Sequence, residues 1–171
     1  MGIVDFFTGR KAPPAGTVPQ DAAALRAALL DLNRETAPFV VREGGPEGAD
    51  LVAEWRIVDA QWYEIFAKAG IKKGGQLLLR LDEATGEVRS IQRDWTLEWR
   101  AGLPVLSFAS EVFRGQKVEL SFGTGWAFRE EDLRFGKVYE YRFQTRELKE
   151  PLQEVTALHG WTWRPVLLGR F

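Results

Sequence analysis

The sequence predicts an α+β fold: a strongly curved antiparallel sheet or open barrel of about seven to nine strands, with two or three packed helices. Three observations lead to this expectation. Apolar and polar residues alternate in many short stretches, short loops rich in Gly and Pro join these stretches, and regular helical crossovers between them are missing. An all-β lipocalin-like barrel with appended helices is the alternative.

The composition is that of one soluble globular domain. The chain has 171 residues, of which 45% are hydrophobic and 27% are charged. Lys and Arg number 23 against 24 Asp and Glu, so the net charge of −1 does not favour nucleic-acid binding. The lack of cysteine excludes disulfides and thiolate chemistry and leads us to expect a cytoplasmic protein. The sequence holds no apolar run of the length that a membrane-spanning helix needs.

The first residues differ from the rest of the chain. Residues 1–11 are predicted to form a short amphipathic arm, residues 12–19 a Pro/Gly-rich linker, and residues 20–171 a single globular domain. The arm has apolar residues at helical spacing, followed by two basic residues: Ile3, Phe6, Phe7, Arg10 and Lys11. This pattern predicts a contact with the domain itself, with a second copy of the chain, or peripherally with an anionic membrane surface.

The next segments predict a helix, a strand, a turn and a second strand. Residues 19–33 show an apolar stripe that includes Leu25 and Leu29, with Pro19 in the first turn and Asn33 as the stop. "APFVVRE" is expected to be a strand and "GGPEG" a turn. A strand begins near Leu51, and a further helix is expected over residues 59–69.

The remaining segments predict mostly strands. "QLLLRL" and "EVRSIQ" flank "DEATG" as a hairpin, and the second strand continues through "DWTLEWR". "VLSFASEVF", "KVELSF" and "KVYEYRF" are expected to be strands as well. A helix over 151–159 is expected to begin at Pro151, with Leu152, Val155 and Leu158 inward, and to end at Gly160 before an edge strand in "WTWRPVLL".

Few residues suggest catalysis. The single histidine, His159, falls at a predicted helix end, where a structural role is expected. No serine lies in a nucleophile elbow, and no metal or cofactor site is expected. A carboxylate-dependent hydrolase would need two acids converging in a cleft. The strand glutamates are instead expected to face solvent and pair with arginines: Glu54, Glu98, Glu119 and Glu140.

The tryptophans fall into two groups. Trp55, Trp95 and Trp99 share the phase of aliphatic neighbours, which predicts core positions. Three more are the candidate ligand-binding residues: Trp126, Trp161 and Trp163. The sequence therefore predicts a non-catalytic binding or interaction module, for a small apolar ligand in a pocket between sheet and helices or for a protein partner. A small carboxylate-dependent hydrolase is the alternative.

Overall fold

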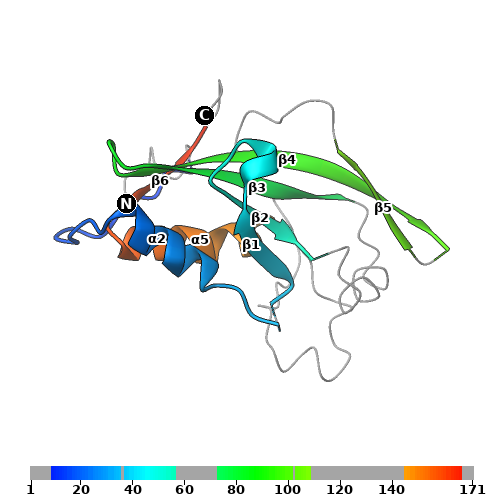
Figure 1. Cartoon of the computed structure of the whole chain (residues 1–171), viewed down its shortest axis with the longest axis horizontal. Coiled ribbons are helices and arrows are strands. Elements are labelled where there is room, and N and C mark those ends of the chain that lie inside the picture. Colours follow the sequence, from blue (N-terminus) through cyan, green and yellow to red (C-terminus); the bar gives the residue numbers. More distant parts are fainter. Residues whose placement is uncertain (1–8, 36, 57–72, 102, 109–144, 167–171) are drawn as a thin grey trace.

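The computed structural model describes residues 9–35, 37–56, 73–101, 103–108 and 145–166. Within these residues the chain forms two α-helices and a mixed sheet, so the α+β expectation is confirmed over its all-β alternative (Figure 1). Several predicted features lie outside the described residues. They include the helix over 59–69, the strands "KVELSF" and "KVYEYRF", and the side chains of Ile3, Phe6, Phe7, Trp95, Glu119, Trp126 and Glu140.

The described sheet has six strands. The strands β1 (Phe39–Glu43), β2 (Leu51–Trp55), β3 (Lys73–Asp82), β4 (Glu87–Arg100) and β5 (Leu103–Phe108) are antiparallel neighbours in that order. The sixth, β6 (Thr162–Pro165), lies parallel to β4. The predicted antiparallel pairing therefore holds for β1 to β5 but not for β6, which is reached through a long connection that ends in a helix. Within the described residues β1 does not pair with β5, so this part of the sheet is open.

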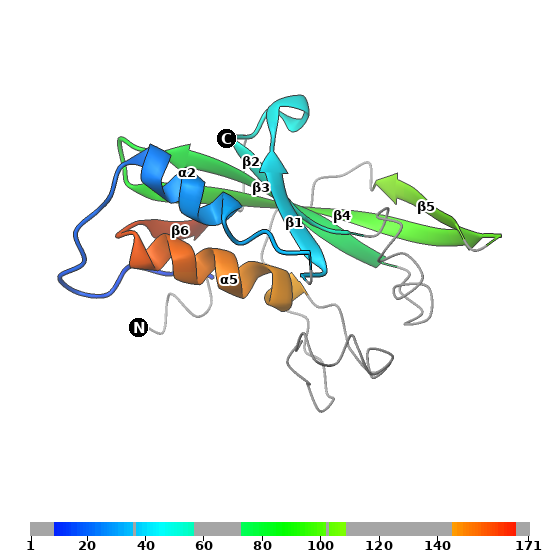
Figure 2. The same cartoon turned by 60° about the horizontal axis from the view of Figure 1, so that its bottom comes forward.

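The hairpin of β3 and β4 is the centre of the sheet. It turns where "DEATG" predicts, with Asp82 opposite Glu87 and Gly86 at a φ of 64°. As expected, β4 continues through "DWTLEWR" to Arg100. One edge of β4 pairs with β3, and the other pairs first with β6 and then with β5. Figure 2 shows the far end of this strand pair, with β5, reaching beyond the helices.

The outer edge of β1 is occupied by side chains. The amide of Asn33 donates to the Val41 carbonyl and accepts from the Val41 N–H, both at 2.7 Å. The Phe39 carbonyl accepts from Arg56 Nε at 3.2 Å, and the Glu43 carbonyl accepts from Arg42 Nη1 at 3.1 Å. Asn33 is therefore more than the helix stop that the sequence suggests, because it pairs with β1 as a neighbouring strand would.

The first helix, α2 (Ala22–Leu30), begins at an aspartate. Asp21 Oδ1 accepts from the Ala24 N–H at 2.7 Å, so Asp21 is the N-cap and the helix begins later than Pro19. Leu25 and Leu29 are buried, as the apolar stripe predicts.

The second helix, α5 (Thr145–Leu158), begins well before the expected Pro151, which lies inside it. The expectation that Leu158 faces inward was wrong, since it is 67% exposed. Leu152 and Val155 pack in the core as expected, and Leu148 joins them, because the three residues recur at i, i+4 and i+7.

The end of α5 is fixed to the chain before α2. Gly160, at a φ of 78°, ends the helix with two bonds, Gly160 N–H to the Ala157 carbonyl and Trp161 N–H to the Thr156 carbonyl. A Cβ on Gly160 would lie 2.6 Å from Pro19 Cα. Just beyond Pro19, Gln20 N–H donates to the His159 carbonyl at 3.0 Å, and the Gln20 carbonyl accepts from Trp161 Nε1 at 2.7 Å. The end of the predicted linker therefore packs closely on the helix end.

The main core lies between the sheet and the helices, which share one face of the sheet (Figure 1). Trp55 is buried there as predicted, and Trp99 packs against the cluster while partly exposed. A second cluster of buried aliphatic residues lies apart from this core: Ala49, Val52, Leu78 and Ile91, with Val166 packed against them.

Candidate functional site

The second cluster marks the sheet face opposite the helices, called the outer face below. Leu51 and Ala53 belong to the main core, so Val52 between them points to the other side. The register places Val52 opposite Leu78, and Leu78 opposite Ile91. With Val166, these residues form a line across β2, β3, β4 and the end of β6, called the apolar row below: Val52, Leu78, Ile91 and Val166.

An arginine row lies beside the apolar row. Arg80 is opposite Arg89, and Arg89 is opposite Arg164, each two positions along its strand from a member of the apolar row. Residues two positions apart on a strand share a face, so all three arginines belong to the outer face. Like charges directly opposite one another destabilise a sheet unless other groups compensate them.

Two carboxylates compensate part of this charge. Glu87, whose side chain is 10% exposed, lies 3.1 Å from Arg164 Nη1, 3.8 Å from Arg89 Nε and 3.8 Å from Arg10 Nη2. Asp82 Oδ2 lies 2.7 Å from Arg89 Nη2. Three guanidinium groups thus face two carboxylates, which leaves one net positive charge in this group. The side chains of Arg10 and Arg164 are about half exposed.

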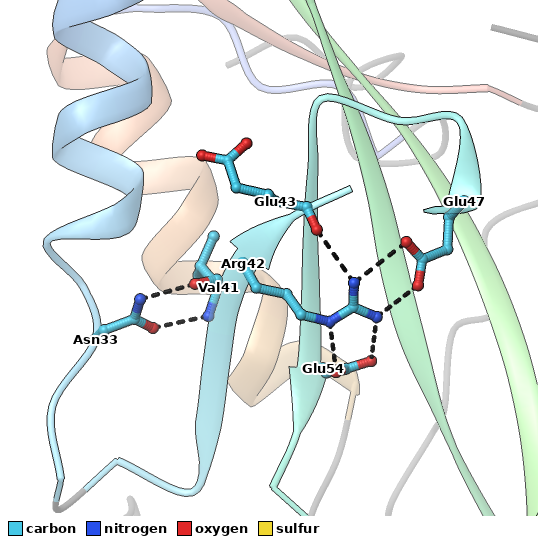
Figure 3. A network of polar contacts seen from close by, with 6 residues as sticks. All are labelled: Asn33, Val41, Arg42, Glu43, Glu47 and Glu54. Carbon is cyan, nitrogen blue, oxygen red and sulfur yellow. Dashed lines mark hydrogen bonds and ion pairs between the residues drawn. The ribbon is translucent and has the colours of Figure 1, made fainter. Parts of the chain in front are cut away.

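A second arginine network lies at the other end of the apolar row. Arg42, opposite Val52, donates Nε to Glu54 Oε1 at 2.8 Å and Nη2 to Glu54 Oε2 at 3.2 Å. It also donates Nη2 to Glu47 Oε1 at 2.5 Å and Nη1 to Glu47 Oε2 at 3.2 Å and to the Glu43 carbonyl (Figure 3). These bonds use all five N–H donors of a guanidinium group. The network therefore joins β1, β2 and the short 3₁₀ helix η1 (Gly45–Glu47) as a structural clamp.

The protonation of this clamp argues against acid–base chemistry. The hydrogen bonds that Arg42 donates to Glu47 lower the pKa of Glu47, and those that it donates to Glu47 and Glu54 raise the pKa of Arg42. Glu47 and Glu54 are two converging carboxylates, as the hydrolase alternative requires, but both bind the same guanidinium. A general acid must hold a proton near neutral pH, and a lowered pKa makes Glu47 unsuited to that role. Within the described ranges, no group of three or more His, Asp or Glu is placed to hold a metal ion.

The remaining predicted residues lie at the sheet edge or in the core. Trp161 and Trp163 are buried in the main core, and their ligand-binding role stays a prediction. Lys11 pairs with Trp163 through two backbone hydrogen bonds of 3.0 and 2.8 Å, so the end of the arm extends the sheet beside β6. This pairing places Arg10 Nη2 3.8 Å from Glu87 Oε1. His159 lies at the end of α5, where its Nδ1 is 2.8 Å from the Val155 carbonyl and donates to it.

Sequence reasoning missed the outer-face residues Glu87, Arg89 and Arg164. Alternation in "WTWRP" places Arg164 out of phase with the two tryptophans, and alternation in "EVRSIQ" places Glu87, Arg89 and Ile91 on the face opposite Val88, so this signal was present. The parallel pairing that joins the two segments is a contact between distant parts of the chain, and alternation alone does not reveal it.

Neither described helix is long and apolar enough to cross a membrane. Comparisons with protein-family models, with curated proteins and with solved structures give no match for the chain. The function is therefore inferred from the residues of the outer face alone.

Proposed function

We propose that this chain is a non-catalytic binding module that holds a small apolar ligand against the apolar row of the outer face. The observation that supports the proposal is the presence of aliphatic clusters on both faces of the sheet, while α2 and α5 pack on one face. An aliphatic sheet face is stable only when a second layer covers it. The chain itself already covers most of the row, since Val52, Leu78 and Ile91 are at most 9% exposed, so a ligand would reach the row at its partly buried member, Val166.

The expected curvature of the sheet, or its form as an open barrel, belongs to this proposal. A curved sheet surrounds a ligand with neighbouring strands and buries more of its surface than a flat sheet does. The location differs from the pocket between sheet and helices that the sequence suggests, because side chains of the main core fill that space, Trp161 and Trp163 among them.

The test is the binding of dodecan-1-ol, a neutral apolar probe, to the full chain by isothermal titration calorimetry. Val166→Thr keeps the shape of the side chain and places a hydroxyl in the apolar row. Val18→Thr makes the same change at a side chain that is 78% exposed, in the segment that packs on the end of α5. An unpaired hydroxyl against an apolar ligand costs about 1–2 kcal/mol, so Val166→Thr should weaken binding about five- to thirtyfold.

Val18→Thr should leave the affinity as it is. Lack of binding to the unmodified chain would contradict the proposal, as would an equal loss of affinity in the two variants. The melting temperatures of both variants are measured in parallel, so that a loss of fold is not taken for a loss of binding.

A further inference from the structure

We propose that residues 9–20, called the strap below, open and close at the Lys11 end while the Gln20 end stays in place. Opening uncovers the edge of β6 that faces away from β4, together with the indole of Trp163. The strap does not include the apolar row, so this movement is independent of the proposed binding function.

The strap is attached to the domain near its two ends, and the attachments differ. At one end the Lys11 N–H donates to the Trp163 carbonyl at 3.0 Å, and the Lys11 carbonyl accepts from the Trp163 N–H at 2.8 Å. These two bonds form an isolated bridge. At the other end Gln20 donates one hydrogen bond and accepts another, beside the close packing of Pro19 on Gly160. The Lys11 end is therefore the one that can separate from the domain without disturbing the end of α5.

The strap buries little of its own surface. Residues 9–20 are all described, and none of them is buried, whereas Trp161 and Trp163 beside them are 2% and 0% exposed. The ion pair of Arg10 with Glu87 spans 3.8 Å and involves a half-exposed arginine, so it stabilises the closed state only weakly. A segment with few buried apolar contacts opens locally at a lower free energy than the whole domain unfolds.

A turn inside the strap holds itself together. The Pro14 carbonyl accepts from the Thr17 N–H at 3.1 Å and from Thr17 Oγ1 at 2.7 Å, and Gly16 has a φ of 82°, as a type II turn requires. A Cβ on Gly16 would meet nothing within 4 Å, and Figure 2 shows this loop, in blue, leaving the body of the domain before it reaches α2. The turn therefore does not depend on the bridge at Lys11 and persists when that bridge opens.

A donor without a partner lies at the end that opens. Trp163 Nε1 is buried and has no hydrogen-bond partner in the part of the chain that the structure describes, whereas Trp161 Nε1 donates to the Gln20 carbonyl. Lys11 is directly opposite Trp163 in an antiparallel bridge, so the two side chains are neighbours on one face. A buried donor without a partner destabilises the closed state, and water satisfies it once the strap opens. The closed state is therefore weakened at the Lys11 end and not at the Gln20 end.

The movement bears on the ligand-binding role predicted for Trp163. A side chain that is 0% exposed contacts a ligand only after its cover moves. Opening of the strap supplies the access that such a role requires, without unfolding of the domain.

The test is hydrogen exchange of single amides in the full chain, followed by nuclear magnetic resonance at several urea concentrations below the unfolding transition. The amides of β6 point to its two edges in turn: those of Thr162 and Val166 donate towards the β4 side at 2.9 Å, and that of Trp163 donates to Lys11. After correction for intrinsic rates, we expect the amides of Lys11 and Trp163 to exchange together and at least about tenfold faster than those of Thr162 and Val166. Their exchange should depend little on urea, because opening exposes little surface.

Two proline variants test the bridge directly. Lys11→Pro removes the N–H that donates to Trp163 and keeps the carbonyl, so the Trp163 amide should exchange about fivefold faster than in the wild type. Ala15→Pro is the matched control, because Ala15 is the second residue of the type II turn, where proline is favoured, and its rates should stay within about twofold of the wild type. Melting temperatures show whether both variants fold, and if Lys11→Pro does not, the wild-type pattern decides.

The possible outcomes separate the opening of the strap from larger movements. Equal exchange of the four amides, with the same urea dependence, would mean that β6 leaves the sheet as a whole and would overturn the proposal. An unchanged Trp163 rate in Lys11→Pro, or an equal acceleration in Ala15→Pro, would overturn it as well. The indole proton of Trp163 should exchange together with the two strap amides and faster than that of Trp161. An indole proton of Trp163 as slow as that of Trp161 would show that opening does not uncover this side chain.

Discussion

Replacing Gly160 by alanine should destabilise the protein in two separable ways. The first is the backbone conformation, because Gly160 has a φ of 78°, where a Cβ is strained. The second is a collision, because the new Cβ would lie 2.6 Å from Pro19 Cα and 2.7 Å from Pro19 N. Both distances are to backbone atoms, so the collision is relieved only if the chain near Pro19 moves.

The size of each effect follows from the contacts. The left-handed conformation costs a residue with a Cβ about 1–2 kcal/mol. Moving Pro19 disturbs two hydrogen bonds at Gln20, its N–H to the His159 carbonyl and its carbonyl to Trp161 Nε1, each worth about 1 kcal/mol. The total for Gly160→Ala is therefore about 3–4 kcal/mol.

A matched control isolates the first effect. Gly86 also has a positive φ, of 64°, but a Cβ there would meet nothing within 4 Å. Gly86→Ala should therefore cost about 1–2 kcal/mol. Asparagine tolerates the left-handed conformation, so Gly86→Asn should be nearly neutral, whereas Gly160→Asn should retain the cost of the collision.

The measurement is urea unfolding followed by circular dichroism, with melting temperatures as a second readout. The difference of about 2 kcal/mol between the two alanine variants corresponds to about 4–8 °C for a chain of this size. If Gly160→Ala and Gly86→Ala lose the same free energy of unfolding, the close packing of Pro19 on the end of α5 does not contribute to stability and the reasoning is wrong. Recovery of full stability in Gly160→Asn would refute the collision in particular.

Two further predictions concern charge. Glu47→Gln should cost about 1–3 kcal/mol at pH 7, because it leaves Arg42 short of a charged partner. The bond to Arg42 lowers the pKa of Glu47, so the stabilisation is complete above the unfolded pKa and is lost as the pH falls through the folded pKa. The gap between wild type and variant in urea unfolding should therefore close in acid, and a gap independent of pH would contradict this. Glu98→Gln, at an exposed pair with Arg100, should change stability by less than about 0.5 kcal/mol. Lys149→Met should stabilise the protein by about 0.5–2 kcal/mol at pH 7, because burial lowers the pKa of Lys149 and disfavours its charged form. Since wild type recovers stability as the pH rises from the folded to the unfolded pKa of this lysine, the advantage should shrink in alkali, and a constant or negative effect would refute the reasoning.

The sequence predicts those parts of the fold that depend on neighbouring residues, such as turns and helix ends. The β3–β4 hairpin follows from alternation and from the turn at Gly86, and Gly160 marks the end of α5. The start of α5 could not be predicted, because proline is common in the first turn of helices and Pro151 therefore suggested a helix start. Its actual place inside α5 depends on the packing of Leu148 in the core.

The candidate site was harder to predict, because it depends on contacts between distant segments. The role of Arg10 beside Glu87 and Arg164 requires β6 to pair in parallel with β4 and the arm to pair with β6. Periodicity gives the face on which a residue lies within its own strand, but it does not give the neighbour of that strand. Glu54 was expected to pair with an arginine, and it does so with Arg42 of the adjacent strand.

The side-chain bonds along β1 have a consequence for aggregation. An uncovered edge strand presents backbone donors and acceptors that recruit strands of other molecules, which is how domain swapping and fibre growth begin. Here Asn33 donates to the Val41 carbonyl and accepts from the Val41 N–H, Arg42 donates to the Glu43 carbonyl, and Arg56 donates to the Phe39 carbonyl. An incoming strand would have to compete with these side chains for the backbone groups of β1, so the side chains protect this edge of the sheet against intermolecular growth.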